Sequence, residues 1–195
     1  KMMTQKKEDI LAAATTLFSK FGYHAVGVDL IIQNSKVAKM TFYKHFPSKN
    51  ELIQHVLKKR DEDIRASIIQ SIESSKSPIS KLKSVFDWYG DWMLSDSFHG
   101  CMFIKASEEF SEADCPMRQI SQGHKQWFTS LLNRLLIDLH TDNSLQIAKH
   151  IVILLEGLTV RSNMYSTSSQ AELRFSWTCV KQLIEVNRES LDSSI

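Results

Sequence analysis

The stretch from residue 41 to residue 49, Thr-Phe-Tyr-Lys-His-Phe-Pro-Ser-Lys, gathers aromatic rings, hydroxyl groups, an imidazole and two lysines. Hydroxyl, imidazole and ammonium groups donate hydrogen bonds to phosphate oxygens, so this combination is typical of a surface that binds nucleic acid. Aromatic side chains near cations also occur in ordinary hydrophobic cores. The nine residues leave both interpretations open, and the flanking sequence has to decide between them.

Positive charge is concentrated in the N-terminal third of the chain. Residues 1–60 hold 11 Lys and Arg against 4 Asp and Glu, whereas residues 61–195 hold 13 against 18. A basic segment joined to an acidic remainder predicts a module that binds a polyanion, followed by a part that does not.

The composition predicts a soluble globular protein. The chain has 195 residues, of which 43% are hydrophobic and 24% are charged, as expected for one large domain or two small ones. The longest apolar runs, such as residues 151–155, are too short to cross a bilayer, and no cleavable leader is recognised, so we expect a cytoplasmic location. Cys101, Cys115 and Cys179 lack CxxC pairing, which favours small buried residues over a disulfide framework or a zinc site.

Helical periodicity predicts an all-α fold. The chain contains 6 glycines and 3 prolines, and apolar residues recur between them with the helical period of 3.6 residues. The first expected helix ends at Gly22, as a helix that closes on a glycine does. Its apolar face consists of Ile10, Leu11, Ala14, Leu17, Phe18 and Phe21.

The next segments have the pattern of a helix-turn-helix. Residues 28–34 and 37–45 are expected as two short helices around a tight break at Ser35 and Lys36, and Pro47 ends the second of them. Ser48 and Glu51 have the spacing of a capping box, which begins a longer helix that runs to about residue 72. Further helical segments are expected at residues 79–93, 102–110, 116–139, 142–164 and 168–189.

Several motifs at fixed spacing lie between residues 10 and 53. They are Ile10-Leu11-x-Ala13-Ala14-x-x-Leu17-Phe18, Gly22-Tyr23, Val37, Thr41-Phe42-Tyr43, His45-Phe46, and Lys49 with Leu52. Together they resemble the DNA-binding region of TetR/AcrR-type transcriptional regulators, and residues 100–125 resemble one branch of the same family. The resemblance implies a three-helix helix-turn-helix DNA-binding domain at residues 1–50 and a larger helical ligand-binding and dimerisation domain at residues 51–195.

The resemblance also implies which residues contact double-stranded DNA. With the helix at residues 37–45 in the major groove, Lys39 and Thr41 are expected at base edges or nearby phosphates. Four further residues match family positions that contact the DNA backbone: Tyr43, Lys44, His45 and Lys49. Phe42 and Phe46 are expected in the core, so the two interpretations of residues 41–49 apply to different faces of one helix.

Three residues depart from the family pattern. Lys36 stands in the turn where glycine is usual, and DNA binding is retained if Lys36 meets a phosphate. Met40 either contacts a thymine methyl group or fills space, and we favour the second interpretation. Asp29 is expected to cap the second helix, where the helix dipole favours an anion.

In the family, a small-molecule pocket lies between the helices of the second domain. The sequence offers an aromatic and sulfur-containing lining, suited to an apolar or aromatic effector, and ordinary core packing is the competing interpretation. The candidate ligand-binding residues are Phe86, Trp88, Trp92, Phe103, Glu109, Met117, His124, Trp127, Phe128, Arg161, Met164 and Tyr165, with Met93 as a further apolar member.

The family also forms homodimers through a four-helix bundle made by the last two helices of each subunit. Apolar stripes suited to that interface are Ile147, Ile151, Leu154, Leu155 and Leu158, then Phe175, Cys179, Leu183 and Val186. Burial in the core of one subunit is the alternative for many of them.

The sequence favours neither a metal site, a cofactor nor an enzyme. His124 with Glu108, Glu109 or Cys101 lacks the spacing of metal ligands, so a hydrogen-bonded core histidine is preferred. No GxSxG, P-loop, GxGxxG or HExxH pattern is present, so no catalytic residue is assigned.

We therefore expect a ligand-responsive transcriptional regulator, a repressor that binds a palindromic operator as a homodimer and is released by a small effector. The alternative is a helical ligand-binding protein with a weakened DNA-binding module, motivated by Lys36 and Met40. A helical-bundle enzyme is the third hypothesis.

Overall fold

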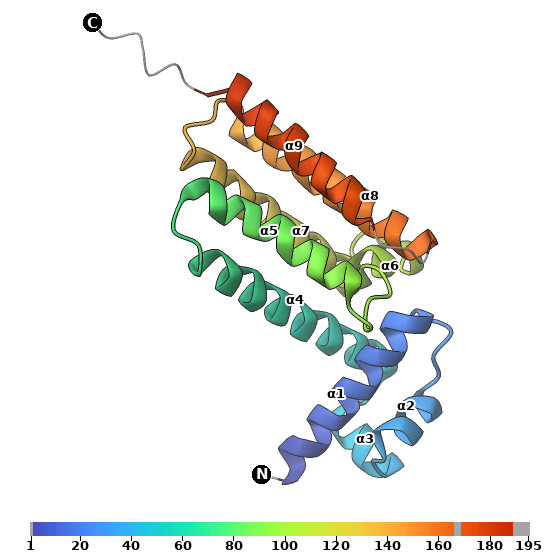
Figure 1. The fold of residues 1–195 in the computed structure, drawn as a ribbon. Helices are drawn as coiled ribbons and strands as arrows, with labels where there is room; N and C mark the ends of the chain where they lie inside the picture. The colour runs from blue at the N-terminus through green and yellow to red at the C-terminus, as the bar shows by residue number, and fades with distance from the viewer. Residues whose placement is uncertain (1, 166–168, 189–195) are drawn as a thin grey trace, which may run out of the picture. The chain divides into compact units, whose positions relative to one another are not determined.

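A computed structural model describes residues 2–165 and 169–188. Within these ranges the chain forms nine α-helices: α1 Met2–Phe21, α2 Val28–Ser35, α3 Lys39–His45, α4 Lys49–Glu73, α5 Pro78–Leu94, α6 Met102–Glu109, α7 Pro116–Ile137, α8 Ser144–Tyr165 and α9 Gln170–Val186 (Figure 1). Among the residues so described, no helix has the length and apolar character needed to span a membrane.

The all-α fold predicted from periodicity is confirmed, and most helix ends fall within two residues of their expected places. The third helix begins at Lys39 rather than at residue 37, because Ala38 has an extended backbone (φ −63°, ψ 144°) and acts as the N-cap. The expected limits of the last helix, residues 168 and 189, lie outside the described residues.

The described residues form two compact units. Unit 1 consists of residues up to Ile64 together with Cys101–His124, and unit 2 consists of Arg65–Gly100 together with residues from Lys125 onward. Two of the three boundaries fall inside α4 and α7, so each of these helices contributes to both units, and the third lies between Gly100 and Cys101, just before α6.

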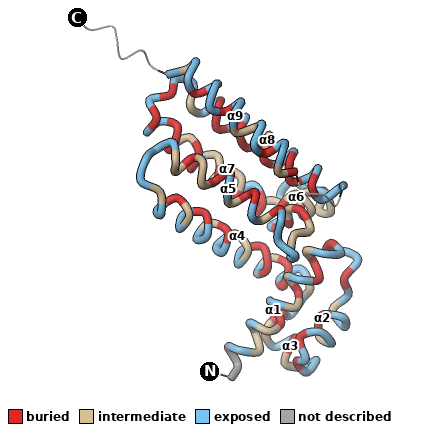
Figure 2. The backbone as a smooth tube through the Cα atoms, viewed as in Figure 1, coloured by how far each residue is buried: buried red, intermediate tan, exposed pale blue. Residues whose placement is uncertain are grey.

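In unit 1, α1 packs against α2 and α3. The expected apolar face of α1 is buried, as the banding of exposure along the helix shows (Figure 2). Phe21 is the exception, with 53% of its surface exposed and the ammonium of Lys20 lying 5.2 Å from its ring centroid. The expectation that Phe21 belongs to the buried face was wrong.

In unit 2, α5 packs against α8 and α9, and α8 packs against α9. Helix α5 begins with a complete capping box, in which the side chains of Ser77 and Ser80 each bond the other's backbone N–H. Pro78 occupies the first turn, where its missing N–H costs no helical hydrogen bond. Leu82, Val85 and Phe86 then face the core at helical spacing.

The turn between α2 and α3 contains a left-handed residue that is not glycine. Lys36 has φ 56° and ψ 27°, a conformation that costs an L-residue roughly 1–2 kcal/mol. The Oγ of Ser35 donates a hydrogen bond to the Ile32 carbonyl at 3.1 Å and so satisfies an acceptor in the last turn of α2. The turn thus forms without glycine, as the sequence requires.

Asp29 does not cap α2, contrary to the expectation. The N-cap is Gly27, and it makes no side-chain capping bond. Asp29 lies in the first turn, where its charge still interacts favourably with the helix dipole, and its side chain bonds Lys39 instead.

Replacing Lys36 by glycine is expected to raise the free energy of unfolding by about 0.5–1 kcal/mol, because relief of the left-handed strain exceeds the added entropy of the unfolded chain. Lys36→Ala removes the same charge but retains a Cβ, so it should leave stability within about 0.5 kcal/mol of the parent. Urea unfolding of the three proteins measures both changes. A glycine variant less stable than the alanine variant would contradict the assigned strain.

Candidate functional site

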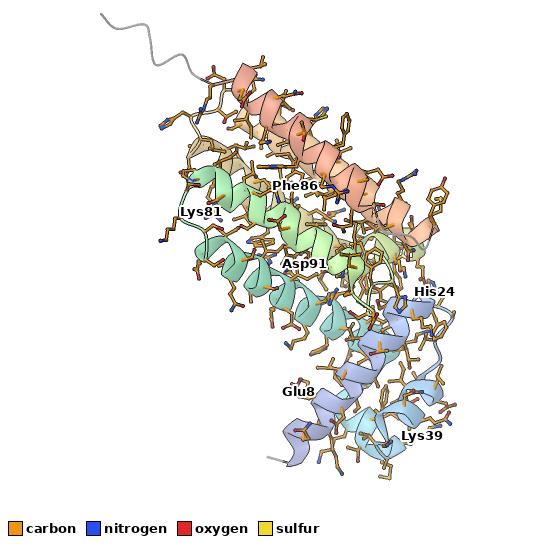
Figure 3. All side chains as sticks on the ribbon, viewed as in Figure 1. Glu8, His24, Lys39, Lys81, Phe86 and Asp91 are labelled. Carbon is orange, nitrogen blue, oxygen red and sulfur yellow. The ribbon has the colours of Figure 1, made fainter. Side chains whose placement is uncertain are left out.

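The exposed face of α3 carries the residue types expected at a nucleic-acid surface. Lys39, Met40, Tyr43 and Lys44 are exposed, and Thr41 is half-buried. Met40 has 87% of its surface exposed, so it does not fill space within the chain, and the packing interpretation preferred for it was wrong. Figure 3 shows Lys39 projecting from α3.

The opposite face of α3 holds the helix in place. Phe42 and Phe46 are fully buried, as predicted, with ring centroids 6.2 Å apart. Phe42 also meets the Tyr43 ring edge-on at 5.3 Å, and Phe46 meets the His55 ring of α4 at the same distance. The aromatic residues of 41–49 are therefore divided between core and surface.

Lys39 is engaged by a neighbouring acid. Its Nζ donates a hydrogen bond to Oδ1 of Asp29 at 3.3 Å, and both side chains are mostly exposed. An exposed pair of this kind stabilises the fold by at most about 1 kcal/mol. Asp29 therefore competes weakly with any anionic partner for the ammonium of Lys39. This pairing was not predicted from the sequence.

His45 and Lys49 are less available than expected. Nε2 of His45 is buried and has no hydrogen-bond partner among the described residues, so it does not point to solvent. Lys49 is half-buried, and burial lowers the pKa of its amine, although the nearby Glu109 carboxylate acts in the opposite direction. Tyr43 and Lys44 are the more accessible of the predicted backbone contacts.

A cavity of about 640 Å³ lies between α1 and the turn of the helix-turn-helix. Lys6 and Lys36 are among its lining residues, together with Asp9 and Asn34. Lys36 thus stands at the edge of a hollow with a second cation, next to the exposed face of α3.

Glu109 at the end of α6 holds the loop between α1 and α2. Its carboxylate accepts hydrogen bonds from the backbone N–H of Tyr23 at 2.9 Å and of His24 at 2.7 Å, and His24 Nδ1 lies 2.9 Å from Oε2. Gly22 has φ 82°, and a Cβ on it would lie 2.4 Å from Oε1 of Glu109. Only glycine permits both the turn and this close approach.

Two further bonds join α6 to the end of α1. Lys105 Nζ donates to the Ser19 carbonyl at 2.6 Å, which satisfies an acceptor in the last turn of α1. The Tyr23 hydroxyl donates to the Met102 carbonyl at 2.7 Å, and burial raises the pKa of Tyr23. The position of the helix-turn-helix therefore depends on α6, a short helix that lies more than 70 residues later in the sequence.

The predicted ligand-binding residues are divided between the two compact units. In unit 2, Trp88 and Trp92 lie 5.7 Å apart, and Tyr89 contacts Phe128 at 5.6 Å, while Trp127 is covered by the guanidinium of Arg65. Phe86 belongs to a separate pair with Trp177.

Other members of the predicted set lie in unit 1. Phe103 stacks on His124 at 4.1 Å, and Nδ1 of His124 lies 2.7 Å from Asp61. His124 is therefore a buried, hydrogen-bonded core histidine. Met117 is also buried, and Glu109 holds the α1–α2 loop. Among the described residues, no group of three or more His, Cys, Asp and Glu side chains is arranged to hold a metal ion.

The last three predicted ligand residues lie on the surface of α8. Arg161 stacks over the ring of Tyr165 at 4.8 Å and lies 3.7 Å from Glu172, and Met164 is 69% exposed. The structure does not bring these residues to the aromatic cluster of unit 2.

The predicted dimerisation stripe of α8 is buried inside its own subunit. Ile147, Ile151, Leu155 and Leu158 are buried and Leu154 is half-buried, so core packing, the alternative interpretation, describes them. On α9 the predicted stripe is exposed, with Phe175 at 71% and Val186 at 84%, and Cys179 and Leu183 beside them. The exposed apolar residues of α8 are different ones: Leu145, Ile153, Val160 and Met164.

Comparison with known proteins identifies relatives of the N-terminal segment and of the fold. Residues 10–56 match the family model of bacterial regulatory proteins of the TetR family. A TetR-family transcriptional regulator from Streptomyces coelicolor has a similar structure, with a TM-score of 0.88 and 25% identity over 95% of this chain and 97% of that one. A TetR regulator from Legionella pneumophila gives a TM-score of 0.79 and 25% identity, over 91% and 96%.

Curated relatives are similar over part of their length. The transcriptional activator FasR of Mycolicibacterium smegmatis is 29% identical over 93 residues, which are 48% of this chain and 42% of FasR. The transcriptional regulator LmrA of Bacillus subtilis is 27% identical over 124 residues, 62% of this chain and 66% of LmrA. The chain thus matches less than two thirds of the length of each.

Glu109→Ala is expected to lower the free energy of unfolding by about 1–3 kcal/mol, because the partly buried N–H of Tyr23 and the exposed N–H of His24 lose their acceptor. Glu109→Gln retains one acceptor oxygen and should lose less. Urea unfolding measures the stability, and hydrogen exchange at Tyr23 and His24 should accelerate in the alanine variant. Glu108→Ala, at an exposed neighbouring position, is the matched control and should change neither measurement. Unchanged exchange at both amides in Glu109→Ala would refute the contact.

Proposed function

Because the chain belongs to the TetR family of helix-turn-helix transcriptional regulators, a family of non-enzymatic transcription factors, we propose that it represses transcription by binding a palindromic operator as a homodimer. In this proposal a small apolar or aromatic effector releases it from the DNA, and it acts in the cytoplasm, where the operator lies. Residues 1–50 form the DNA-binding domain, and residues 51–195 bind the effector and the second subunit.

The observation that carries the proposal is the division of α3 into two faces. Phe42 is fully buried, whereas Met40 and Lys44 are exposed on the other side of the same helix, and Lys39 and Tyr43 are exposed on its flank. A helix that is anchored on one face and cationic on the other fits the major groove, where its N-terminal residues reach bases and its flanks reach phosphates. Lys36 adds a cation at the turn that leads into this helix.

Exposed apolar residues on α8 and α9 support the homodimer. Phe175 and Val186 on α9 and Ile153 on α8 are each more than half exposed, and large exposed apolar patches mark association surfaces. A second copy is the partner that a two-fold operator requires, because two recognition helices must meet half-sites about one DNA turn apart.

Release by an effector follows from linkage. An effector that prefers a conformation with misplaced recognition helices weakens DNA binding by the same factor by which DNA weakens effector binding, typically about 1–3 kcal/mol. Helices α4 and α7 each contribute to both compact units, so they are the connections through which such a change would pass.

The proposal is tested by binding of the purified protein to the DNA upstream of its own gene, with shuffled DNA of equal length as the control. Preferential binding with log affinity falling steeply against log salt is expected. Indifference between the two DNAs at low salt would favour the alternative, a ligand-binding protein whose DNA-binding module is weakened.

Tyr43→Ala should weaken binding to all operator variants alike, because a backbone contact carries no sequence information, whereas Lys39→Ala should also change which bases are preferred. Asp29→Asn should have the opposite sign and strengthen binding at low salt by roughly two- to fivefold, because it frees Lys39 from its carboxylate. Fluorescence anisotropy with a panel of single-base operator variants measures all three. Lys76→Ala, a lysine of unit 2, is the control for lost charge. If Lys39→Ala lowers the affinity for every operator variant by the same factor, the role assigned to Lys39 is contradicted.

The double variant Phe175→Glu, Val186→Glu should sediment with the mass of one chain, 22.4 kDa, because four carboxylates would face each other across the two-fold interface. Its operator affinity should fall with the loss of the second half-site contact. Leu94→Glu adds a carboxylate at another exposed apolar position, on α5, and should remain dimeric. Sedimentation equilibrium distinguishes the two, and a dimeric double variant would refute the interface.

A further inference from the structure

A groove of about 600 Å³ lies between α5 and α9 in unit 2. This volume is within the range of about 300–1,000 Å³ that small-molecule sites occupy. Among the residues predicted from the sequence to bind the effector, only Phe86 lines it. The groove is therefore a different place from the cluster of Trp88, Trp92 and Phe128.

Two aromatic rings form the apolar part of the groove. Phe86 of α5 is buried, and Trp177 of α9 is half-buried, with ring centroids 5.1 Å apart and planes inclined at 58°. Trp177 leaves part of its ring open to a third ring at the usual spacing of about 4.5–7 Å, and Phe86, which is 1% exposed, packs behind it. The ammonium of Lys181 lies 6.0 Å from the Trp177 centroid, which makes the surroundings of that ring cationic.

The two helices approach closely at one end of the groove. A Cβ on Gly90 would lie 2.9 Å from Cδ2 of Leu173, and Gln170 Nε2 donates to the Gly90 carbonyl at 3.0 Å. Phe86, one turn before Gly90 on α5, contacts Trp177, one turn after Leu173 on α9. The helices therefore run antiparallel here, and Gly90 sets the distance between them.

Opposite charges flank the groove on its two walls. Lys83 and Asp87 pair with each other along α5. Asp91 on α5 and Arg174 on α9 also line the groove, and neither makes an ion pair or a side-chain hydrogen bond within the described ranges. Because the helices are antiparallel and Gly90 faces Leu173, Asp91 and Arg174 lie on the two walls with an offset of roughly 3 Å along the helix axes. Figure 3 shows Phe86 and Asp91 on the same helix.

We propose that this groove binds a small aromatic zwitterion of the size of an aromatic amino acid, with its ring against Trp177, which Phe86 supports from within the core, its carboxylate on Arg174 and its ammonium on Asp91. The guanidinium fork of arginine matches a carboxylate, and the aspartate accepts hydrogen bonds from an ammonium group. An uncharged ligand would use neither charge, and a singly charged ligand would use one. That such binding controls the operator rests on the function proposed above.

The groove remains accessible when the exposed apolar face of α9 is covered by a second subunit. Residues three and four apart share a helix face, so Arg174, Trp177 and Thr178 lie together on the groove side. Phe175, Cys179 and Val186 share a different face, turned away from that side by more than a quarter of a turn. Ligand binding and dimerisation thus use separate faces of α9.

Isothermal titration of the full chain with L-tryptophan, tryptamine and indole-3-propionate tests the assignment. Tryptophan should bind most tightly. Arg174→Gln should weaken tryptophan and indolepropionate by roughly fivefold and leave tryptamine unchanged, and Asp91→Asn should weaken tryptophan and tryptamine and leave indolepropionate unchanged. Both residues are exposed, so the variants are expected to fold. Arg134→Gln and Asp138→Asn, at exposed positions of α7 and the turn after it, are the matched controls.

Absence of heat with all three compounds at millimolar concentration would overturn the assignment, as would tryptophan binding no better than the single-charge analogues or equal affinities in both groove variants. Operator binding is measured in a separate experiment, so failure of the ligand assignment and failure of the proposed function can be distinguished. If the ligand fails to bind a protein that recognises its operator, the groove assignment is wrong and the regulator stands. If the ligand binds a protein that ignores its operator, the site stands and the proposed function is wrong.

Discussion

Burial of one phenylalanine determines which side chains of α3 are exposed. A helix of seven residues is too short to be stable in water by itself, so α3, Lys39–His45, exists because its packing stabilises it. Phe42 is fully buried and Phe46 continues that contact toward α4. The helical period then places Met40 and Lys44 on the opposite side, with Lys39 and Tyr43 exposed on the flank of the helix. Core packing and the presentation of cations are consequences of the same seven-residue geometry.

Features encoded by neighbouring residues could be predicted from the sequence. Gly22, the break at Lys36, Pro47 and the spacing of Ser48 with Glu51 each mark a helix end within a few positions, and the helices lie where those signals place them. The contact of Glu109 with the α1–α2 loop could not be predicted, because it joins residues 86 positions apart. In the sequence, Glu109 differs in no way from Glu108 beside it.

Apolar stripes on the last helices illustrate a different limit. Periodicity shows that a face is apolar, but it does not show whether the same chain or a second one covers that face. Ile151 is buried within its own unit, whereas Ile153, two positions on, is 62% exposed. The charges of the α5–α9 groove could not be predicted from the sequence for a similar reason. Asp91 and Arg174 look like ordinary surface residues in the sequence, and only the contact of Gly90 with Leu173 places them on facing walls.

The Glu109 contact has a thermodynamic consequence for DNA recognition. Residues 22–27 connect α1 to α2, and a single carboxylate gathers their amides. Any event that removes this carboxylate lets the connection sample more conformations, and DNA binding then has to order it again. The entropy of association becomes less favourable and the heat capacity change of binding more negative. The temperature dependence of operator affinity would therefore report on a side chain that lies outside the helix-turn-helix, on α6.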